Sequence, residues 1–154
     1  MATSPLGAGP PIRLVLDTNV VVAGLLWNGP PRRVMELAIA SGEGPAVELF
    51  SSAVLLDELA HTLAYPKFAG RIAGFGTSVT ALVTHFTALV TLVVPASVPR
   101  VVANDADDDH VIAAAVAARA QLIVTGDRKH LLPIGSHRGI AIVEAADALS
   151  RLGA

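Results

Sequence analysis

The chain has 154 residues, no cysteine and a formal net charge of −2, and 53% of its residues are hydrophobic. This length fits a single domain with a buried core, and the lack of cysteine excludes disulfides and thiolate metal sites. The small negative charge excludes a strongly basic nucleic-acid-binding protein, so local basic residues or metal ions would have to hold any polyanionic substrate.

The first eleven residues are rich in proline and glycine and are expected to be disordered. They have neither the basic start nor the apolar stretch of a secretory signal. No apolar run reaches the roughly 18 residues of a membrane-spanning helix. We therefore expect residues 12–154 to form one domain of a cytoplasmic protein that does not associate with a membrane.

Strands and helices are expected to alternate along the rest of the chain. Strands are predicted at residues 12–16, 46–50, 90–94, 121–125 and 139–143. Helices are predicted at residues 20–27, 30–40, 53–64, 67–71, 77–89, 108–119 and 144–152, with one further helical turn at 128–132. This alternation predicts an α/β fold in three α/β/α layers around a central, mainly parallel five-stranded sheet.

Four acidic side chains stand out at the ends of these elements. Asp17 follows the first strand, Asp127 follows the strand at 121–125, Asp109 begins the helix at 108–119, and Glu58 lies on the helix at 53–64. Parallel strands end at one common edge of the sheet, where α/β folds bind their ligands. Clustered carboxylate oxygens bind hard divalent cations, so the combination predicts a cation site at this edge.

Each acid also has a simpler interpretation. Asp17 alone could cap the helix that follows it, Glu58 alone could be a solvated helix residue, and Asp127 alone could be a turn residue. One or two acids of the cluster at 105–109 must serve as caps or loop residues. His110 and His130 lie close in sequence to the acids, but a single histidine is more often a surface or packing residue than a ligand.

Three blocks of the sequence are similar to those of the PIN-domain family, and within it to the toxin components of bacterial toxin–antitoxin pairs. The blocks are Leu16–Val20, Ser52–Leu59 with Tyr65–Phe68, and Asp105–Leu132. The resemblance implies an endoribonuclease that depends on Mg²⁺ or Mn²⁺ and leaves 5′-phosphate and 3′-hydroxyl ends. It also implies an RNA substrate, a small antitoxin protein as partner and a homodimer.

The same resemblance assigns roles to individual residues. It implies that Asp17, Glu58, Asp109 and Asp127 bind the metal and carry catalysis, with Asp108 as the alternative to Asp109. The supporting polar residues would be Thr18, Asn19 and Thr125. Ala106 stands where the family commonly has proline.

Several basic residues are candidates for holding RNA phosphates. They are Arg128 and Lys129, close to the acids in sequence, and Arg32, Arg33, Lys67 and Arg71 elsewhere. Each could equally be a solvated surface charge.

Other functions are compatible with the same fold. A nuclease acting on DNA or structured nucleic acid would carry the same residues, and a non-catalytic binding module would not need all four acids. A phospho-acceptor domain would require an aspartate after its third strand and a lysine after its fifth. Pro95 and Glu144 follow those strands here, so the phospho-acceptor interpretation is set aside.

Overall fold

A computed structural model describes residues 10–39, 46–96 and 106–154 of the chain. The N-terminal segment expected to be disordered is residues 1–11, and residues 1–9 lie outside the described residues. Asp105 of the acidic cluster also lies outside them. The first strand begins at residue 12, as the sequence predicts.

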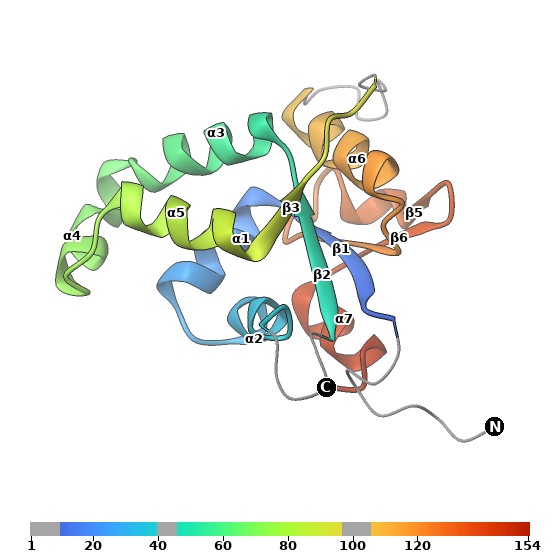
Figure 1. Ribbon diagram of the computed structural model, residues 1–154, viewed down its shortest axis with the longest axis horizontal. Helices are drawn as coiled ribbons and strands as arrows, with labels where there is room; N and C mark the ends of the chain where they lie inside the picture. The colour runs from blue at the N-terminus through green and yellow to red at the C-terminus, as the bar shows by residue number, and fades with distance from the viewer. Residues whose placement is uncertain (1–9, 40–45, 97–105) are drawn as a thin grey trace.

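The described residues form one six-stranded sheet of strand order β3-β2-β1-β4-β6-β5, shown in Figure 1. The strands are β1 (Ile12–Leu16), β2 (Val47–Ser51), β3 (Val90–Leu92), β4 (Leu122–Val124), β5 (Ser136–His137) and β6 (Ile140–Val143). Every neighbouring pair is parallel except β5 with β6. The predicted α/β class and mainly parallel sheet are therefore confirmed.

The strand count differs from the predicted five because β5 is an additional short edge strand. It contains two residues and pairs with β6 through a tight turn at Arg138 and Gly139, whose φ angles are 50° and 80°. Two successive positive φ angles are typical of a two-residue hairpin turn. Arg-Gly is not among the usual sequences for such a turn, and two residues cannot show an alternating pattern.

Seven α-helices surround the sheet in the described part of the chain. They are α1 (Thr18–Leu26), α2 (Pro30–Glu36), α3 (Ala53–Leu63), α4 (Pro66–Gly74), α5 (Val79–Leu89), α6 (Ala106–Ala118) and α7 (Ala145–Arg151). The helical turn predicted at residues 128–132 is wrong in its bounds and type: residues 128–131 form a turn, and a 3₁₀ helix follows at Leu132–Ile134. Pro133 is better tolerated in such a short opening turn than inside a continuing α-helix.

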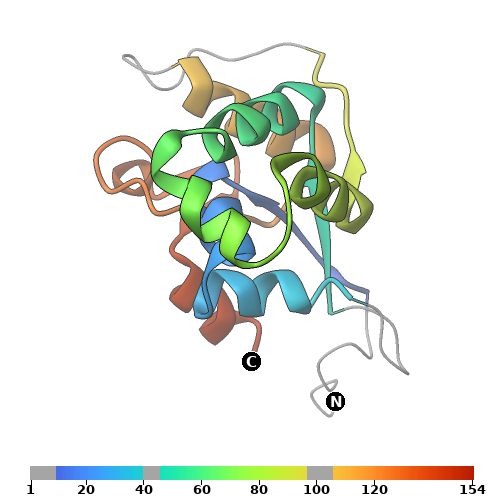
Figure 2. The same cartoon turned by 90° about the vertical axis from the view of Figure 1, so that its left-hand side faces the viewer.

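Alternate side chains of β1, β2, β4 and β6 enter two separate cores. Leu14 and Leu16 of β1 pack with residues of α1, α2 and α7, whereas Val15 between them packs with the apolar face of α6. Because successive strand side chains point to opposite faces, this alternation produces the three layers visible in Figures 1 and 2. Helices α3, α4 and α5 extend the first core beyond the end of the sheet through Leu59, Ile72 and other apolar side chains.

The direction of chain progression reverses between β1 and β4. From β1 the chain continues outward to β2 and β3, then crosses to β4 on the other side of β1. Such a switch point leaves a crevice at the carboxyl ends of the two central strands, where open α/β sheets bind ligands. The sheet therefore brings the residues that follow β1 and β4 together.

Within the three described ranges, no single helix is long and apolar enough to cross a membrane. Helices α4 and α5, bent by 81° relative to each other, pass the same length and composition test only as a pair.

Candidate metal centre

Asp17 lies at the carboxyl end of β1, where it is both the N-cap of α1 and a member of the sheet. Its backbone N–H donates to the Val124 carbonyl at 2.9 Å, and one side-chain oxygen accepts from the Thr18 N–H at 2.8 Å. The other oxygen accepts from Asn19 Nδ2 at 3.2 Å and from the Thr125 hydroxyl at 2.7 Å. With only 5% of its surface exposed, the Asp17 side chain is held in one orientation by two donors from the start of α1 and one from the residue after β4.

Glu58 joins this arrangement through Thr18. The Thr18 hydroxyl donates to Glu58 Oε2 at 3.0 Å, across 40 residues of sequence. Ser52 caps α3 by accepting from the Leu55 N–H, and this start of the helix leads Glu58 over the end of β1. The hydrogen bond from Thr18 therefore places Glu58 of α3 beside the residues that follow β1.

Asp127 sits in the turn after β4 and connects to Asp17 through Thr125. The Thr125 hydroxyl that donates to Asp17 also accepts from the Asp127 N–H at 3.0 Å. One Asp127 oxygen accepts from the backbone N–H groups of Lys129 and His130, each at 3.0 Å. Thr125 is fully buried, so it fixes the spacing between the two aspartates.

The pKa of Asp127 reflects competing effects of this environment. Partial burial raises the pKa, but the backbone hydrogen bonds from His130 and Lys129, a side-chain hydrogen bond with Asp108 and the charge of His130 lower it. The result is a pKa below the ordinary value, so that the carboxylate remains ionised and able to accept hydrogen bonds or bind a cation.

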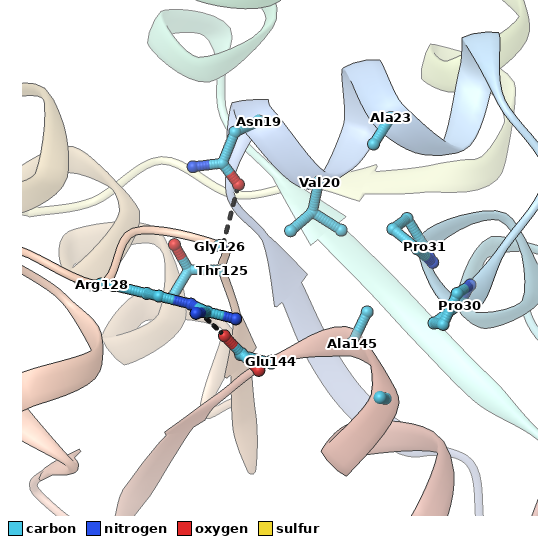
Figure 3. A pocket seen from close by; sticks show the side chains of 11 residues that line it. Asn19, Val20, Ala23, Pro30, Pro31, Thr125, Gly126, Arg128, Glu144 and Ala145 are labelled. Carbon is cyan, nitrogen blue, oxygen red and sulfur yellow. Dashed lines mark hydrogen bonds and ion pairs between the residues drawn. The ribbon is translucent and has the colours of Figure 1, made fainter.

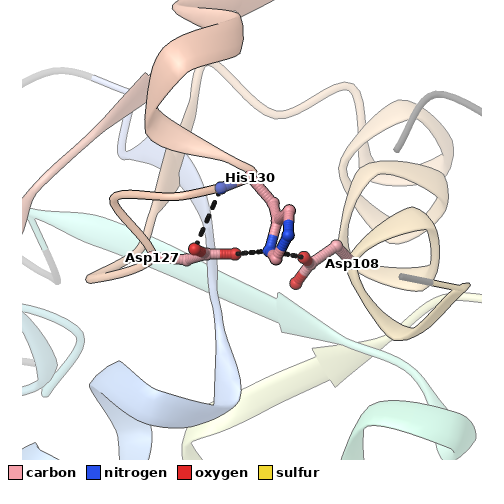
Figure 4. Close-up of side chains that lie close together, drawn as sticks. All are labelled: Asp108, Asp127 and His130. Carbon is pink, nitrogen blue, oxygen red and sulfur yellow. Dashed lines mark hydrogen bonds and ion pairs between the residues drawn. The ribbon is translucent and has the colours of Figure 1, made fainter. Parts of the chain in front are cut away.

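His130 brings α6 to this turn. Its Nδ1 lies 3.4 Å from Asp127 Oδ2 and 3.8 Å from Asp108 Oδ2 (Figure 4). Among the described residues, Asp108, Asp127 and His130 form a group whose ligand atoms all lie within 4.8 Å of one another. Asp109, one residue further along α6, is fully buried.

The geometry therefore favours Asp108 as the residue that could share an ion with Asp127. Metal binding by Asp109, which the family resemblance implies, stays a prediction.

This donor set fits a divalent cation. Adjacent ligand atoms of an octahedral ion with bonds of about 2.1 Å are about 3.0 Å apart, and opposite ones about 4.2 Å. The two distances from His130 Nδ1 fall within that range. Two carboxylates and one imidazole supply anionic oxygens and a nitrogen, a combination that Mn²⁺ and later transition metals accept more readily than Mg²⁺ does.

A pocket of about 380 Å³ opens beside Asn19 and Thr125, on the side away from α6 (Figure 3). Its lining residues come from α1, α2 and the segments after β4 and β6: Asn19, Val20, Ala23, Pro30, Pro31, Thr125, Gly126, Arg128, Glu144, Ala145 and Ala146. Asn19 shapes one wall by accepting from the Gly126 N–H at 3.0 Å. Arg128 forms an ion pair of 2.9 Å with Glu144 at the opposite wall.

The basic residues predicted to hold phosphates have different surroundings. Arg128 is exposed and engages Glu144, and Lys129 is exposed next to Asp127. Both lie beside the acids, and their role in substrate binding stays a prediction.

Glu144 and His130 were not predicted as site residues from the sequence. Glu144 follows β6 in the same way that Asp17 follows β1, so its place at the carboxyl end of a strand could have identified it. His130 stood out only as close in sequence to the acids, because its approach to Asp108 depends on how α6 packs on the sheet. Thr18, Asn19 and Thr125 each donate a hydrogen bond to one of the acids, and their supporting roles stay a prediction.

The fold and the acidic edge define an α/β domain of the nuclease type. A model of the PIN domain matches residues 13–129, a range that includes Asp17, Glu58, Asp108, Asp109 and Asp127. The chain belongs to the PIN domain family. Its members are generally metal-dependent nucleases, and the acidic residues at the switch point are of the kind that binds such a metal. A search of curated proteins finds no match for the chain.

Proposed function

We propose that this chain is a metal-dependent endoribonuclease and the toxin of a toxin–antitoxin pair. The observation that carries the proposal is the connected network at the switch point, which runs from Glu58 through Thr18, Asp17 and Thr125 to Asp127. Asp108 and His130 extend it onto α6. A non-catalytic module has no need to hold so many carboxylates at the ligand-binding edge of its sheet.

In this proposal the protein contributes acids and their fixed geometry. Asp127, Asp108 and His130 would hold one ion, and Asp17 and Glu58 would hold a second ion or orient the substrate. When bound, Mg²⁺ or Mn²⁺ supplies Lewis-acid stabilisation of charge on the phosphate and activates water. Thr125 keeps Asp17 and Asp127 at a constant spacing, and the buried surroundings of Asp17 strengthen electrostatic interactions there.

A cleavage assay with single-stranded RNA tests the activity. We expect cleavage with Mg²⁺ or Mn²⁺, none in EDTA, and loss of activity in Asp17→Asn and Asp108→Asn. Asp147→Asn is the matched control, because Asp147 is an exposed acid on α7 paired with Arg151. Undiminished cleavage in EDTA would exclude the mechanism.

Two further arms refine the assignment. If Asp109→Asn is inactive and Asp108→Asn is active, Asp109 is the ligand on α6. If a DNA flap is cut and single-stranded RNA is not, the substrate class is DNA.

The proposed partners are a second copy of the chain and a small antitoxin, docking on the segments at residues 31–40 and 53–64. Ile39 and Val54 support this, since they are large apolar side chains in those segments with 54% and 46% of their surface exposed. Light scattering at micromolar concentration should give a dimer, and a strictly monomeric protein would exclude it. Co-expression of the product of an adjacent small open reading frame should suppress cleavage if that product is the antitoxin.

A further inference from the structure

The end of the molecule farthest from β6 carries most of the aromatic side chains. These are the single Trp, the single Tyr and two of the four Phe residues: Trp27, Tyr65, Phe68 and Phe75. They lie on or beside α4, which projects beyond the sheet between α3 and α5 and faces the viewer in Figure 2. Trp27, Tyr65 and Phe75 have 41%, 50% and 54% of their surface exposed.

Cationic side chains alternate with these rings. The Lys67 ammonium lies 5.1 Å from the Phe68 ring centre, and Phe68 meets Trp27 edge to face at 6.1 Å. The Arg71 guanidinium lies 4.6 Å from the Trp27 centre and 5.1 Å from that of Phe75. We refer to Lys67, Phe68, Trp27, Arg71 and Phe75 together as the cation–aromatic strip.

Arg71 fixes the position of the strip on the domain. Its Nε donates to the Leu26 carbonyl at the end of α1, so it satisfies a helix-terminal acceptor while its plane stacks between two rings. Arg71 thus ties Trp27 and Phe75 to the end of α1, while about half of the surface of each residue stays exposed to solvent. Rigid, exposed aromatic faces are typical of a binding surface.

Four of the five strip residues lie in a segment of the sequence without acidic residues. Although the chain as a whole is slightly acidic, it contains no Asp or Glu between Leu59 and Asn104, a stretch that includes Lys67 and Arg71. The nearest acids in sequence are Asp57 and Glu58 on α3, and Glu58 belongs to the candidate metal centre. A polyanion with flat rings is the ligand that such a surface complements, because its phosphates meet the cations and its bases stack on the aromatic faces.

A hollow runs along α3 from the candidate metal centre towards the strip. Its volume is about 320 Å³, and its lining residues include Glu58 and Tyr65, the N-cap of α4, which precedes Lys67 of the strip by two residues. A strand that leaves the acids beside Glu58 can therefore follow α3 to the exposed rings.

From these observations we propose that the cation–aromatic strip binds the single-stranded RNA that flanks the cleaved bond. This inference rests on the proposed ribonuclease function for the identity of the nucleic acid. It assigns α4 to substrate binding, and it requires unpaired bases, because bases within a duplex are stacked on each other and do not offer their faces to protein rings.

Binding of a fluorescent 12-nucleotide oligo(U) to the full chain in EDTA tests the proposal without cleavage. Phe75→Ala should weaken binding roughly 5-fold or more, the lower end of what stacking one base contributes. Lys67→Ala should weaken binding and reduce the slope of log affinity against log salt by about 0.7, the value for one phosphate contact with a single strand. Duplex RNA of the same length should bind more weakly than the single strand.

Two exposed residues away from the strip provide matched controls. Val94→Ala removes an apolar side chain that is 93% exposed, and Arg151→Ala removes one positive charge from α7. Neither variant should alter oligo(U) affinity beyond twofold. Arg71 is not replaced, because its bond to the Leu26 carbonyl gives it a structural role as well.

The outcomes separate this proposal from the proposed function. If RNA is cut in Mn²⁺ and both strip variants bind oligo(U) like the wild type, the strip proposal is wrong and the nuclease proposal stands. If the variants weaken oligo(U) binding and no RNA is cut, the strip binds nucleic acid and the nuclease proposal fails. Two further outcomes would overturn the proposal if Phe75→Ala leaves oligo(U) affinity unchanged. Loss of a dimer in this variant would assign the surface to a second copy of the chain, and loss of binding to anionic vesicles would assign it to a lipid.

Discussion

The Thr125 hydroxyl bridges Asp17, which follows β1, and Asp127, which follows β4. Replacing it by valine keeps the volume but removes a hydroxyl that donates to Asp17 and accepts from the Asp127 N–H. Because both partners are left without that bond in a buried setting, Thr125→Val should lower the free energy of unfolding by about 1–3 kcal/mol. Urea denaturation in EDTA measures this change.

The control for Thr125 is serine, which retains the hydroxyl and loses one methyl group. We expect Thr125→Ser to bind Mn²⁺ like the wild type and to lose only the small cost of the missing methyl, about 1 kcal/mol. Equal losses of Mn²⁺ affinity in the serine and valine variants would mean that the hydroxyl does not position the aspartates.

His130 should influence which cation binds. Its nitrogen lies close to Asp108 and Asp127, and imidazole favours transition metals over Mg²⁺. His130→Ala should lower the affinity for Mn²⁺ about 10-fold or more and that for Mg²⁺ by much less. Isothermal titration gives both affinities, and pulsed EPR of bound Mn²⁺ detects the coupled nitrogen.

The exposed His85 on α5 provides the control for this experiment. His85→Ala should change neither affinity nor the EPR signal. A nitrogen coupling that persists in His130→Ala would show that His130 is not a ligand.

The lowered pKa of Asp127 makes its contribution to stability depend on pH. A carboxylate with a lower pKa in the folded state stabilises the protein above its unfolded-state pKa of about 3.9, and this stabilisation is lost as the pH falls through the folded-state value. In EDTA, the wild type should exceed Asp127→Asn in stability by a constant amount above about pH 5. The gap should close below pH 4, and a gap that widens with acid would contradict the assignment.

The sequence predicts the part of the site that lies directly after the two central strands. Asp17 and Asp127 were identified because parallel strands end at one edge, and that edge was predicted from alternating elements alone, whereas Thr125 was named only through the family resemblance. The choice between Asp108 and Asp109 could not be predicted, since neighbouring helix residues point about 100° apart and the rotation of α6 is set by its packing on β1 and β4. The same packing brings His130 to Asp108.

Among the described glycines, Gly24 on α1 leaves the least space for an added side chain. A methyl group there would meet Met35 Sδ and would lie 3.2 Å from the Pro31 carbonyl carbon and 3.3 Å from the Arg32 nitrogen. Backbone cannot yield as a side chain does, so Gly24→Ala should separate α1 from α2 and cost about 1–3 kcal/mol. Thermal melts with a single two-state transition measure the loss.

Gly70 on α4 is the control for Gly24, and the same substitution to alanine should raise stability there rather than lower it. No atom lies within 4 Å of the position its Cβ would take, so Gly70→Ala should stabilise the protein by about 0.5–1 kcal/mol through helix propensity alone. If both variants are destabilised equally, close packing at Gly24 is not the cause.

At the scale of elements, segments with an apolar pattern were predicted well, and two short segments without one were not. The apolar spacing of Leu55, Leu59 and Leu63 predicts α3, and all three side chains are buried. In contrast, β5 has two residues, and the segment after Asp127 is shaped by hydrogen bonds to one aspartate oxygen. Neither feature produces a repeating pattern in the sequence.

For the molecule as a whole, metal binding should be coupled to stability. A cation that binds only the folded state raises the free energy of unfolding by about 2.7 kcal/mol at a hundredfold excess over its dissociation constant. Mn²⁺ should therefore raise the melting temperature of the wild type, and Asp17→Asn should lose most of that rise. Equal shifts in both proteins would mean that Asp17 does not contribute to the metal centre.

The hydrogen bond between Asp17 and Thr125 joins residues 108 positions apart. A ribosome adds about 5–20 residues per second, so roughly 5 to 20 s of synthesis separate the two partners. Throughout that interval the growing chain carries Asp17 and then Glu58 without the hydroxyl that orients Asp17 or the turn that carries Asp127. Messages that end before β4 would yield chains without a complete acidic site, so the distance between β1 and β4 along the chain delays completion of that site until β4 and the turn after it have been synthesised.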